Sequence, residues 1–228
     1  MSELGTVIVT GGASGLGRAI AEVVERAGGR PVVLDVNAPS NGFVHRIVDL
    51  ADTRSAEDAV REIAEEQGDL RAVVTAAGVD ACGRIEDIPG ADWERVLGVN
   101  LLGTAAVVRA ALPYLERSSG RVVTVASTLG LRALSDATAY CASKFGVVGF
   151  SRALAAETAG RVGVTCLVPG GMRTSFFDGR DEQYKPPPDA ELASPEHVAE
   201  TVLFALTRPH GVEMRELVVC PSTEPSWP

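Results

Sequence analysis

The stretch that decides the fold is Thr10-Gly11-Gly12-Ala13-Ser14-Gly15-Leu16-Gly17, which follows a short apolar run at residues 6–10. A helical pattern begins at once after it, so backbone N–H groups and the positive end of that helix face the turn. Gly11 allows the tight turn, Gly15 lets the backbone approach a phosphate, and Gly17 allows the helix to pack closely on the strand. The pattern predicts a pyrophosphate site, and a strand-to-helix turn without a ligand is the alternative. Its cofactor-binding residues would be Gly11, Ser14, Gly15, Leu16 and Gly17.

Short β-rich runs alternate with helical segments along the rest of the chain, which is typical of repeated βαβ units. We therefore predict one α/β domain over residues 1–228, a doubly wound, Rossmann-type parallel seven-stranded sheet with helices on both faces. The predicted strands are 6–10, 31–35, 43–48, 72–76, 121–126, 162–168 and 216–220. The predicted helices are 16–27, 55–67, 93–116, 139–159 and 195–207.

Two stretches break this alternation. Residues 171–193 lack periodicity and contain Phe176, Phe177 and three consecutive prolines. A loop of this length in a compact domain is usually a lid, a binding loop or disordered, and we expect a substrate-binding lid here. The C-terminal tail, residues 221–228, cannot continue a strand or helix because its prolines lack N–H donors. We expect an irregular tail that lies over the surface or against a neighbouring subunit.

Composition limits the possible functions. A chain of 228 residues with 46% hydrophobic content can bury one full core. The net charge of −9 disfavours binding to nucleic acid or to an anionic membrane, so a small-molecule substrate is expected. No apolar run approaches the ~20 residues of a membrane helix, and the N-terminus does not resemble a signal peptide. Four scattered cysteines indicate reduced thiols in a cytoplasmic protein and no metal site.

Two aspartates follow predicted strands at positions that suit a dinucleotide. Asp35 comes eighteen residues after Gly17, close to the interval at which an acidic residue meets the adenosine ribose. A carboxylate there repels a 2′-phosphate, and neither Ser14 nor residues 36–37 supply a cation. This favours NAD over NADP, the alternative being a carboxylate that only caps the strand in solvent. Asp49 is expected either at the adenine ring or in an exposed turn.

Tyr140 and Lys144 are four residues apart in a predicted helix and therefore share one face. A phenol titrates near pH ~10, but an ammonium about 4 Å away contributes up to ~4 kcal/mol toward its ionised form at an effective dielectric of roughly 20. The chain has only one other lysine, Lys185, and neither Tyr114 nor Tyr184 has a lysine four residues later. We therefore predict that Tyr140 transfers a proton at a lowered pKa, the alternative being a surface tyrosine beside a solvated lysine.

The glycine loop, the Tyr140–Lys144 pair and Ser127, thirteen residues before Tyr140, together resemble the short-chain dehydrogenase/reductase family. The resemblance implies hydride transfer between nicotinamide and a secondary alcohol or ketone, with Asn100, Ser127, Tyr140 and Lys144 as catalytic residues. Tyr140 would be the general acid/base, Ser127 would hydrogen-bond the substrate oxygen, and Lys144 would bind the nicotinamide ribose. Asn100 would kink its helix and hold a water that connects the lysine to solvent. Taken alone, Ser127 and Asn100 fit a turn serine and a helix-boundary asparagine equally well.

The segment Pro169-Gly170-Gly171-Met172-Arg173-Thr174 also resembles the family, in the part that lies beside the nicotinamide. The resemblance implies cofactor contacts from Pro169, Gly170 and Thr174, whose hydroxyl would meet the carboxamide. A Pro-Gly turn at the end of a strand explains Pro169 and Gly170 equally well.

Three positions depart from the family pattern. In Thr75-Ala76-Ala77-Gly78, where the resemblance implies that Ala77 and Gly78 bind cofactor, Thr75 replaces the usual asparagine and offers one hydroxyl instead of an amide. Val168 likewise replaces a frequent asparagine, and Pro221 interrupts the usual C-terminal ending. We expect weaker support of the fourth strand and altered subunit contacts, with unchanged chemistry.

The helix predicted at 93–116 is apolar on most of its circumference, so it should be buried on more than one side. We expect it to pack against its copy in a homodimer or homotetramer, as the resemblance also implies.

Two other functions remain as alternatives. A non-catalytic NAD-binding regulator or scaffold would be expected to carry a damaged catalytic set, and this set is intact. A nucleotide-sugar epimerase agrees less well, because such relatives are longer and space their glycines differently. For the substrate, aromatic residues of the predicted lid suggest a partly apolar pocket. The cations Arg173, Arg180 and Lys185 could meet an anionic group.

Overall fold

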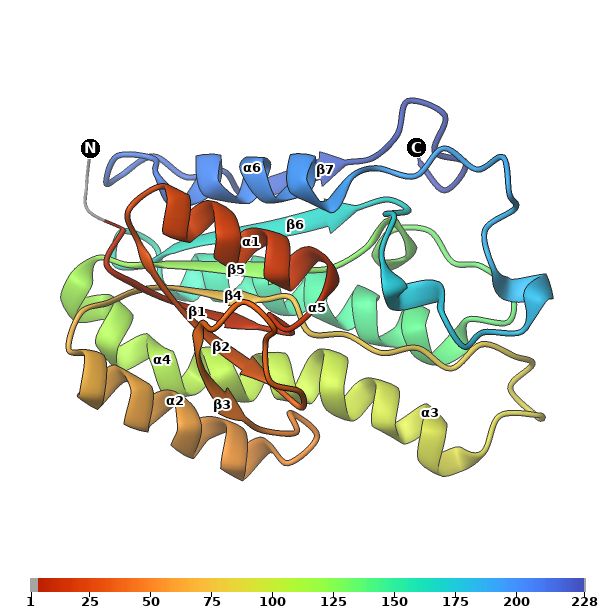
Figure 1. Ribbon diagram of the computed structural model, residues 1–228, viewed down its shortest axis with the longest axis horizontal. Helices are drawn as coiled ribbons and strands as arrows, with labels where there is room; N and C mark the ends of the chain where they lie inside the picture. Colours follow the sequence, from red (N-terminus) through yellow and green to blue (C-terminus); the bar gives the residue numbers. More distant parts are fainter. Residues whose placement is uncertain (1–3, 228) are drawn as a thin grey trace.

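The computed structural model describes residues 4–227, so residues 1–3 and the last residue of the predicted tail, Pro228, lie outside the described residues. Seven parallel strands form one sheet in the order β3-β2-β1-β4-β5-β6-β7, which confirms the doubly wound α/β domain (Figure 1). Strand ends differ from the predicted ones by two residues at most. The strands are β1 (Thr6–Thr10), β2 (Arg30–Asp35), β3 (Val44–Ile47), β4 (Leu70–Thr75), β5 (Arg121–Val125), β6 (Gly163–Pro169) and β7 (Glu216–Val219).

Helices cover both faces of the sheet. In Figure 1, α1 and α6 lie on one face, and α2, α4 and α5 lie on the other. Each layer has its own apolar core, with Ile20 and Val198 on the first face and Val107 and Leu115 on the second. The helices are α1 (Gly15–Arg26), α2 (Thr53–Gln67), α3 (Gly90–Leu97), α4 (Thr104–Ser118), α5 (Thr138–Glu157) and α6 (Pro195–Leu206).

The helix predicted at 93–116 extends further and is interrupted. One helical run of 29 residues reaches from Gly90 to Ser118, with the π-helical segment η1 (Gly98–Gly103) between α3 and α4. Its mean hydropathy reaches 1.6, so by length and composition it could cross a membrane, contrary to the expectation from the sequence. The run packs against β4, α2 and α5, and its apolar face belongs to the protein core.

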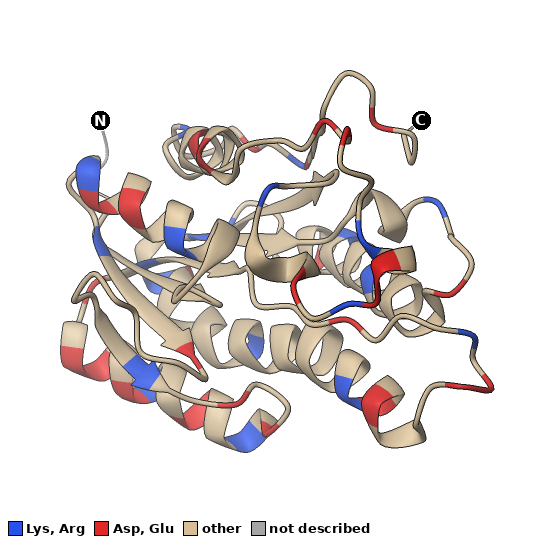
Figure 2. Ribbon diagram, turned by 45° about the vertical axis from the view of Figure 1, so that its right-hand side comes forward, with Lys and Arg blue, Asp and Glu red and all other residues tan. Residues whose placement is uncertain are grey.

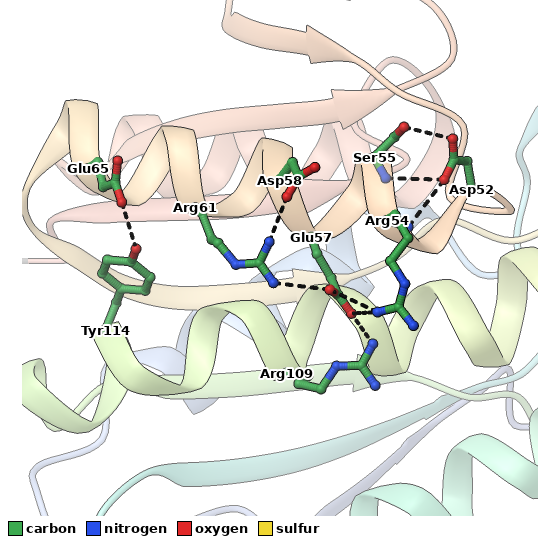
Figure 3. A network of polar contacts seen from close by, with 9 residues as sticks. All are labelled: Asp52, Arg54, Ser55, Glu57, Asp58, Arg61, Glu65, Arg109 and Tyr114. Atoms are coloured by element: carbon green, nitrogen blue, oxygen red, sulfur yellow. Dashed lines mark hydrogen bonds and ion pairs between the residues drawn. The ribbon is translucent and has the colours of Figure 1, made fainter.

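A buried carboxylate joins α2 to α4 on the face opposite α1. Glu57 of α2 is almost fully buried and accepts from Arg54 at 3.0 Å, from Arg61 at 3.0 Å and from Arg109 of α4 (Figure 3). A buried carboxylate is tolerated only when charged donors satisfy it, and its bond to Arg109 links the two helices.

All the parallel strands end at one edge, and the order reverses between β1 and β4, where doubly wound sheets bind ligands. A cavity of about 1640 Å³ opens there. The irregular segment 171–193 overhangs it and contains two short 3₁₀ turns, η3 (Ser175–Phe177) and η4 (Glu182–Tyr184). Two backbone hydrogen bonds hold the base of this segment. The N–H of Arg173 donates to the Ala193 carbonyl at 2.9 Å, and the N–H of Ala193 donates to the Gly171 carbonyl at 2.9 Å. This edge therefore gathers the residues singled out above.

Candidate active site

The glycine loop is held against two strands. Gly11 donates its N–H to Leu34 at 2.8 Å and has a φ of +68°, in the left-handed region that favours glycine. A Cβ on Gly11 would lie 2.7 Å from the Cα of Ala77, and one on Gly17 would collide with the Gly11 carbonyl. Ser14 is the N-cap of α1, yet its side chain makes no capping hydrogen bond. The turn therefore requires glycine and leaves a serine hydroxyl near a helix N-terminus.

Asp35 and Asp49, the residues predicted to meet the adenosine ribose and the adenine ring, both line the cavity. The carboxylate of Asp35 accepts from the N–H of Ala13 at 3.0 Å and of Asn37 at 2.9 Å, so it braces the glycine loop. Asp49 accepts from Ala51 and pairs with Arg95 at 3.0 Å.

The backbone N–H of Ala51, together with Arg95, lowers the pKa of Asp49 despite partial burial. Asp49 is thus both a turn residue and a residue of the cavity wall. Both aspartates line the cavity that the glycine loop also lines.

The segment after β6 meets the glycine loop from the other side. Thr174 lies beside Gly15, where an added Cβ would come within 3.4 Å of the threonine side chain. Pro169 and Gly170 line the same cavity, as do Ala77 and Gly78 after β4. The predicted cofactor residues come from six segments and surround one space. A nicotinamide dinucleotide fits this set, with backbone donors at the glycine turn and an acid at Asp35.

The catalytic candidates lie at the other side of that space. Lys144 is buried in α5, and its Nζ donates to the Val125 carbonyl at 2.8 Å. The same nitrogen lies 5.6 Å from the ring centroid of Tyr140, one turn earlier in the helix. Ser127, which follows β5, hydrogen-bonds the phenol of Tyr140 and also accepts from Leu129 at 3.1 Å. Two hydroxyls and an amine therefore converge where a substrate oxygen could bind.

The phenol pKa shifts in the direction opposite to the one expected from the Tyr140–Lys144 spacing. Burial raises the pKa of Tyr140, and the hydrogen bond from Ser127 offsets only part of this. Burial also lowers the pKa of Lys144 to about 8. The expected lowering of the Tyr140 pKa was wrong, because desolvation disfavours the charged form of both side chains and the Lys144 amine is directed to a backbone carbonyl.

Asn100 connects the π-helical segment to the site. Its Oδ1 accepts from Val79 at 2.8 Å, and its Nδ2 donates to the Val79 carbonyl at 2.9 Å and to Ser143 at 3.0 Å. Gly78 lies between it and Lys144, since an added Cβ would be 3.6 Å from Asn100 and 3.7 Å from the amine. Asn100 lies in a π-helical segment, a feature often found at functional sites, and the kink expected there stays a prediction. A water held by Asn100 stays a prediction.

Known proteins share this arrangement. A protein-family model described as short chain dehydrogenase matches residues 5–185. The chain belongs to the short-chain dehydrogenase family. The D-threitol dehydrogenase of Mycolicibacterium smegmatis is 36% identical over 220 residues, which cover 86% of this chain and 84% of the relative. An uncharacterised oxidoreductase of Staphylococcus aureus is 30% identical, covering 94% of this chain and 96% of the relative.

A solved structure agrees with these relatives. The aldohexose dehydrogenase of Thermoplasma acidophilum superposes with a TM-score of 0.87 and 26% identity, over 96% of this chain and 94% of that one. This short-chain dehydrogenase is therefore an oxidoreductase of a family that binds NAD or NADP.

One departure from the family pattern has a visible consequence in this short-chain dehydrogenase. The Thr75 hydroxyl is buried with no hydrogen-bond partner among the described residues. The neighbouring strand supplies the support instead, because the Thr10 hydroxyl accepts from the N–H of Ala77 at 3.0 Å. The substitution therefore alters how the end of β4 is held and leaves the catalytic residues in place.

The predicted lid, residues 171–193, contributes to a buried ion pair that the sequence did not reveal. Arg180 pairs with Asp80 at 2.8 Å, and its guanidinium lies over the rings of Phe176 and Phe177. Phe176 in turn stands 5.7 Å from Tyr140, ring centre to centre. Asp80 belongs to no motif, and its only signal in the sequence is its place two residues after Gly78 at the end of a strand.

Of the three cations expected to meet an anionic substrate, two are paired with carboxylates of the protein and one lies outside the cavity. Arg180 pairs with Asp80, and Lys185 pairs with Glu182 at 2.5 Å. Arg173 is exposed and lies outside the residues that line the cavity.

The C-terminal tail lies over the active-site edge of its own chain, one of the two surfaces expected for it. Glu224 accepts from the N–H of Gly171 at 2.8 Å, and the Ser226 hydroxyl meets that of Thr128 at 2.7 Å. The tail thus joins the segment after β6 to the residue that follows Ser127. Sequence reasoning missed Glu224, because a glutamate in a proline-rich tail carries no motif.

Proposed function

We propose that this protein is a cytoplasmic NAD-dependent dehydrogenase that moves a hydride between nicotinamide and a secondary alcohol or ketone. The observation that carries the proposal is the meeting of Ser127, Tyr140 and Lys144 in the cavity whose other wall is the glycine loop. Four free cysteines among the described residues agree with a reducing compartment.

Each catalytic residue has a role that its surroundings support. Nicotinamide, when bound, supplies the hydride acceptor. Ser127 and Tyr140 would hold the substrate oxygen between their hydroxyls, and Tyr140 would take the alcohol proton in oxidation and return it in reduction. Burial raises the phenol pKa, so ionisation of Tyr140 depends on positive charge beside it. Lys144 is the cation in position to supply that charge.

The preference for NAD rests on Asp35. Its carboxylate lines the cavity next to the glycine loop, where a 2′-phosphate would meet a negative charge, and Val36 and Asn37 offer no cation. We expect NADH to bind at least about tenfold more tightly than NADPH, equivalent to about 1.4 kcal/mol. Titration followed by nicotinamide fluorescence measures both constants. Tighter binding of NADPH would contradict the assignment.

The test of the enzyme is a panel of secondary alcohols with NAD, followed by the absorbance of reduced nicotinamide. Tyr140→Phe should lower kcat by about 10³-fold, the usual contribution of a general acid/base, and leave NADH affinity within about twofold. Tyr184→Phe, which alters a lid phenol that lines the same cavity, is the matched control. NADH binding without turnover of any alcohol would favour a non-catalytic NAD-binding scaffold.

We also propose a homodimer or homotetramer. Leu102 of η1 is 55% exposed and Phe145 of α5 is 45% exposed, which is unusual for large apolar side chains on packed helices. Contact with a second copy would cover both. Light scattering coupled to size exclusion would show a multiple of 23.8 kDa, and a single species of that mass would refute the proposal.

A further inference from the structure

The wall of the cavity is rich in acids, and its cations are all engaged. Among the described residues, nine carboxylates and six cationic side chains line it. Figure 2 shows both signs interspersed along the loops at this end of the molecule. The cations and their partners are Arg84 with Glu86, Arg95 with Asp49, Arg132 with the Pro225 carbonyl, Lys144 with the Val125 carbonyl, Arg180 with Asp80, and Lys185 with Glu182. An anionic substrate would therefore meet nine carboxylates, and each cation that could attract it already has a partner.

One of these pairs lies beside the catalytic phenol. The side chains of Asp80 and Arg180 are only 8% and 16% exposed, so water screens the pair weakly. Phe176 lies between the guanidinium and Tyr140, with Arg180 4.8 Å from its ring centroid. Asp80 and Arg180 also act on the pKa of Tyr140 in opposite directions, which agrees with this proximity.

The pair retains hydrogen-bonding capacity. The Nε of Arg180 is buried without a partner among the described residues, and leaving a donor unsatisfied costs about 1–3 kcal/mol. Asp80 accepts from Ala81, Cys82 and Arg180, whereas a carboxylate has room for about four donors. The Asp80 carboxylate therefore has room for one more donor, beside a guanidinium that keeps an unsatisfied N–H.

The chemistry of the pair selects among substrates. A hydroxyl group is both donor and acceptor and carries no charge, so it matches a neutral pair of this kind. A carboxylate on the substrate would meet the charge of Asp80, and a hydrocarbon would leave the polar atoms without partners. Sites built to bond a hydroxyl discriminate strongly against analogues that lack it.

We propose that Asp80 and Arg180 form a specificity-determining subsite that binds a second hydroxyl of the substrate, which is an uncharged polyol. This inference rests on the proposed dehydrogenase function and specifies its substrate class. Asp80 accepts a hydrogen bond from this hydroxyl. Arg180 keeps Asp80 in place and contacts the rings of Phe176 and Phe177 beside Tyr140.

Three four-carbon compounds test the subsite: threitol, 2-butanol and 3-hydroxybutanoate. The wild-type protein should oxidise threitol with a kcat/KM at least about 100-fold above that for either of the others. Asp80→Asn should lower kcat/KM for threitol by at least about tenfold, mainly through KM, and change that for 2-butanol by less than about threefold. Asp87→Asn removes the same charge from an exposed residue of the cavity wall and should leave both values unchanged.

A binding readout separates the subsite from the chemistry. With NADH bound, oxidation cannot proceed, and threitol should raise the Tm of the wild-type protein but not of Asp80→Asn. Threitol binding through Asp80 without oxidation of any alcohol would refute the dehydrogenase and keep the subsite. Equal losses for threitol and 2-butanol in Asp80→Asn, a preference for 3-hydroxybutanoate, or no threitol shift in either protein would overturn the subsite.

Discussion

The two ends of the cavity are built in different ways. The glycine end, Gly11–Gly17 with Asp35, is made mainly of backbone from one strand-turn-helix unit. Its shape requires glycine at positions where a Cβ would collide with neighbouring atoms. The lid end consists of side chains from segments far apart in sequence. Asp80 and Arg180 are 100 residues apart, and Glu224 is 53 residues from Gly171.

This difference has a physical consequence. At the glycine end a Cβ on Gly11 or Gly17 meets backbone atoms, so substitutions at these two positions should be severe and independent of substrate. At the lid end the contacts are made by individual side chains through hydrogen bonds, ion pairs and ring contacts, so substitutions should be moderate and depend on the substrate. Tyr140 and Lys144 line the same cavity, and Asp80 of the lid end acts on the pKa of both.

The largest effect is expected at the glycine end. Gly17→Ala places a Cβ against the Gly11 carbonyl and should weaken NADH binding by about 100-fold, or roughly 3 kcal/mol, because the turn must open. Fluorescence titration measures the affinity, and thermal unfolding checks the fold. Gly149→Ala is the matched control, since no atom lies within 4 Å of its added Cβ. Unchanged NADH affinity in Gly17→Ala would remove the contrast between the two ends.

The second effect concerns the pH dependence of stability that arises from Lys144. Burial lowers the pKa of Lys144 from 10.5 to about 8, so above pH 8 the native amine loses its proton while the unfolded chain keeps it. Stability rises with pH where the unfolded state binds more protons. The free energy of unfolding of the wild type should therefore gain about 2 kcal/mol between about pH 7 and 9.5 relative to Lys144→Met.

Urea unfolding across this pH range measures the difference. Lys185→Met supplies the control, because Glu182 raises the pKa of Lys185 and that residue cannot produce the same gain. Parallel pH profiles for the wild type and Lys144→Met would show that the Lys144 amine is not held in a desolvated site.

The smallest effect is expected from the tail at the lid end. Deleting residues 221–228 removes the bonds to Gly171 and Thr128 and should lower kcat/KM by about tenfold, equivalent to about 1.4 kcal/mol. Glu224→Ala should account for about half of this free energy. Thr223→Ala breaks a bond to Glu191 in the lid and should have little effect. Full activity of the truncated chain would mean that the tail only covers the edge.

The sequence alone determined the architecture and the glycine end of this protein. Seven strands and the glycine turn could be predicted because period, turn chemistry and helix start signals act over a few residues. Tyr140 and Lys144 could be placed together for the same reason, since a helix brings residues four apart onto one face.

Only the tertiary structure decided the rest. The direction of the phenol pKa depends on the burial of Tyr140, and the sequence shows the Tyr140–Lys144 spacing without the desolvation. Asp80, Arg180 and Glu224 gain their roles from partners that packing brings from distant segments. Such contacts leave no periodic pattern in the chain, because they follow from how loops settle on the sheet edge rather than from local backbone geometry.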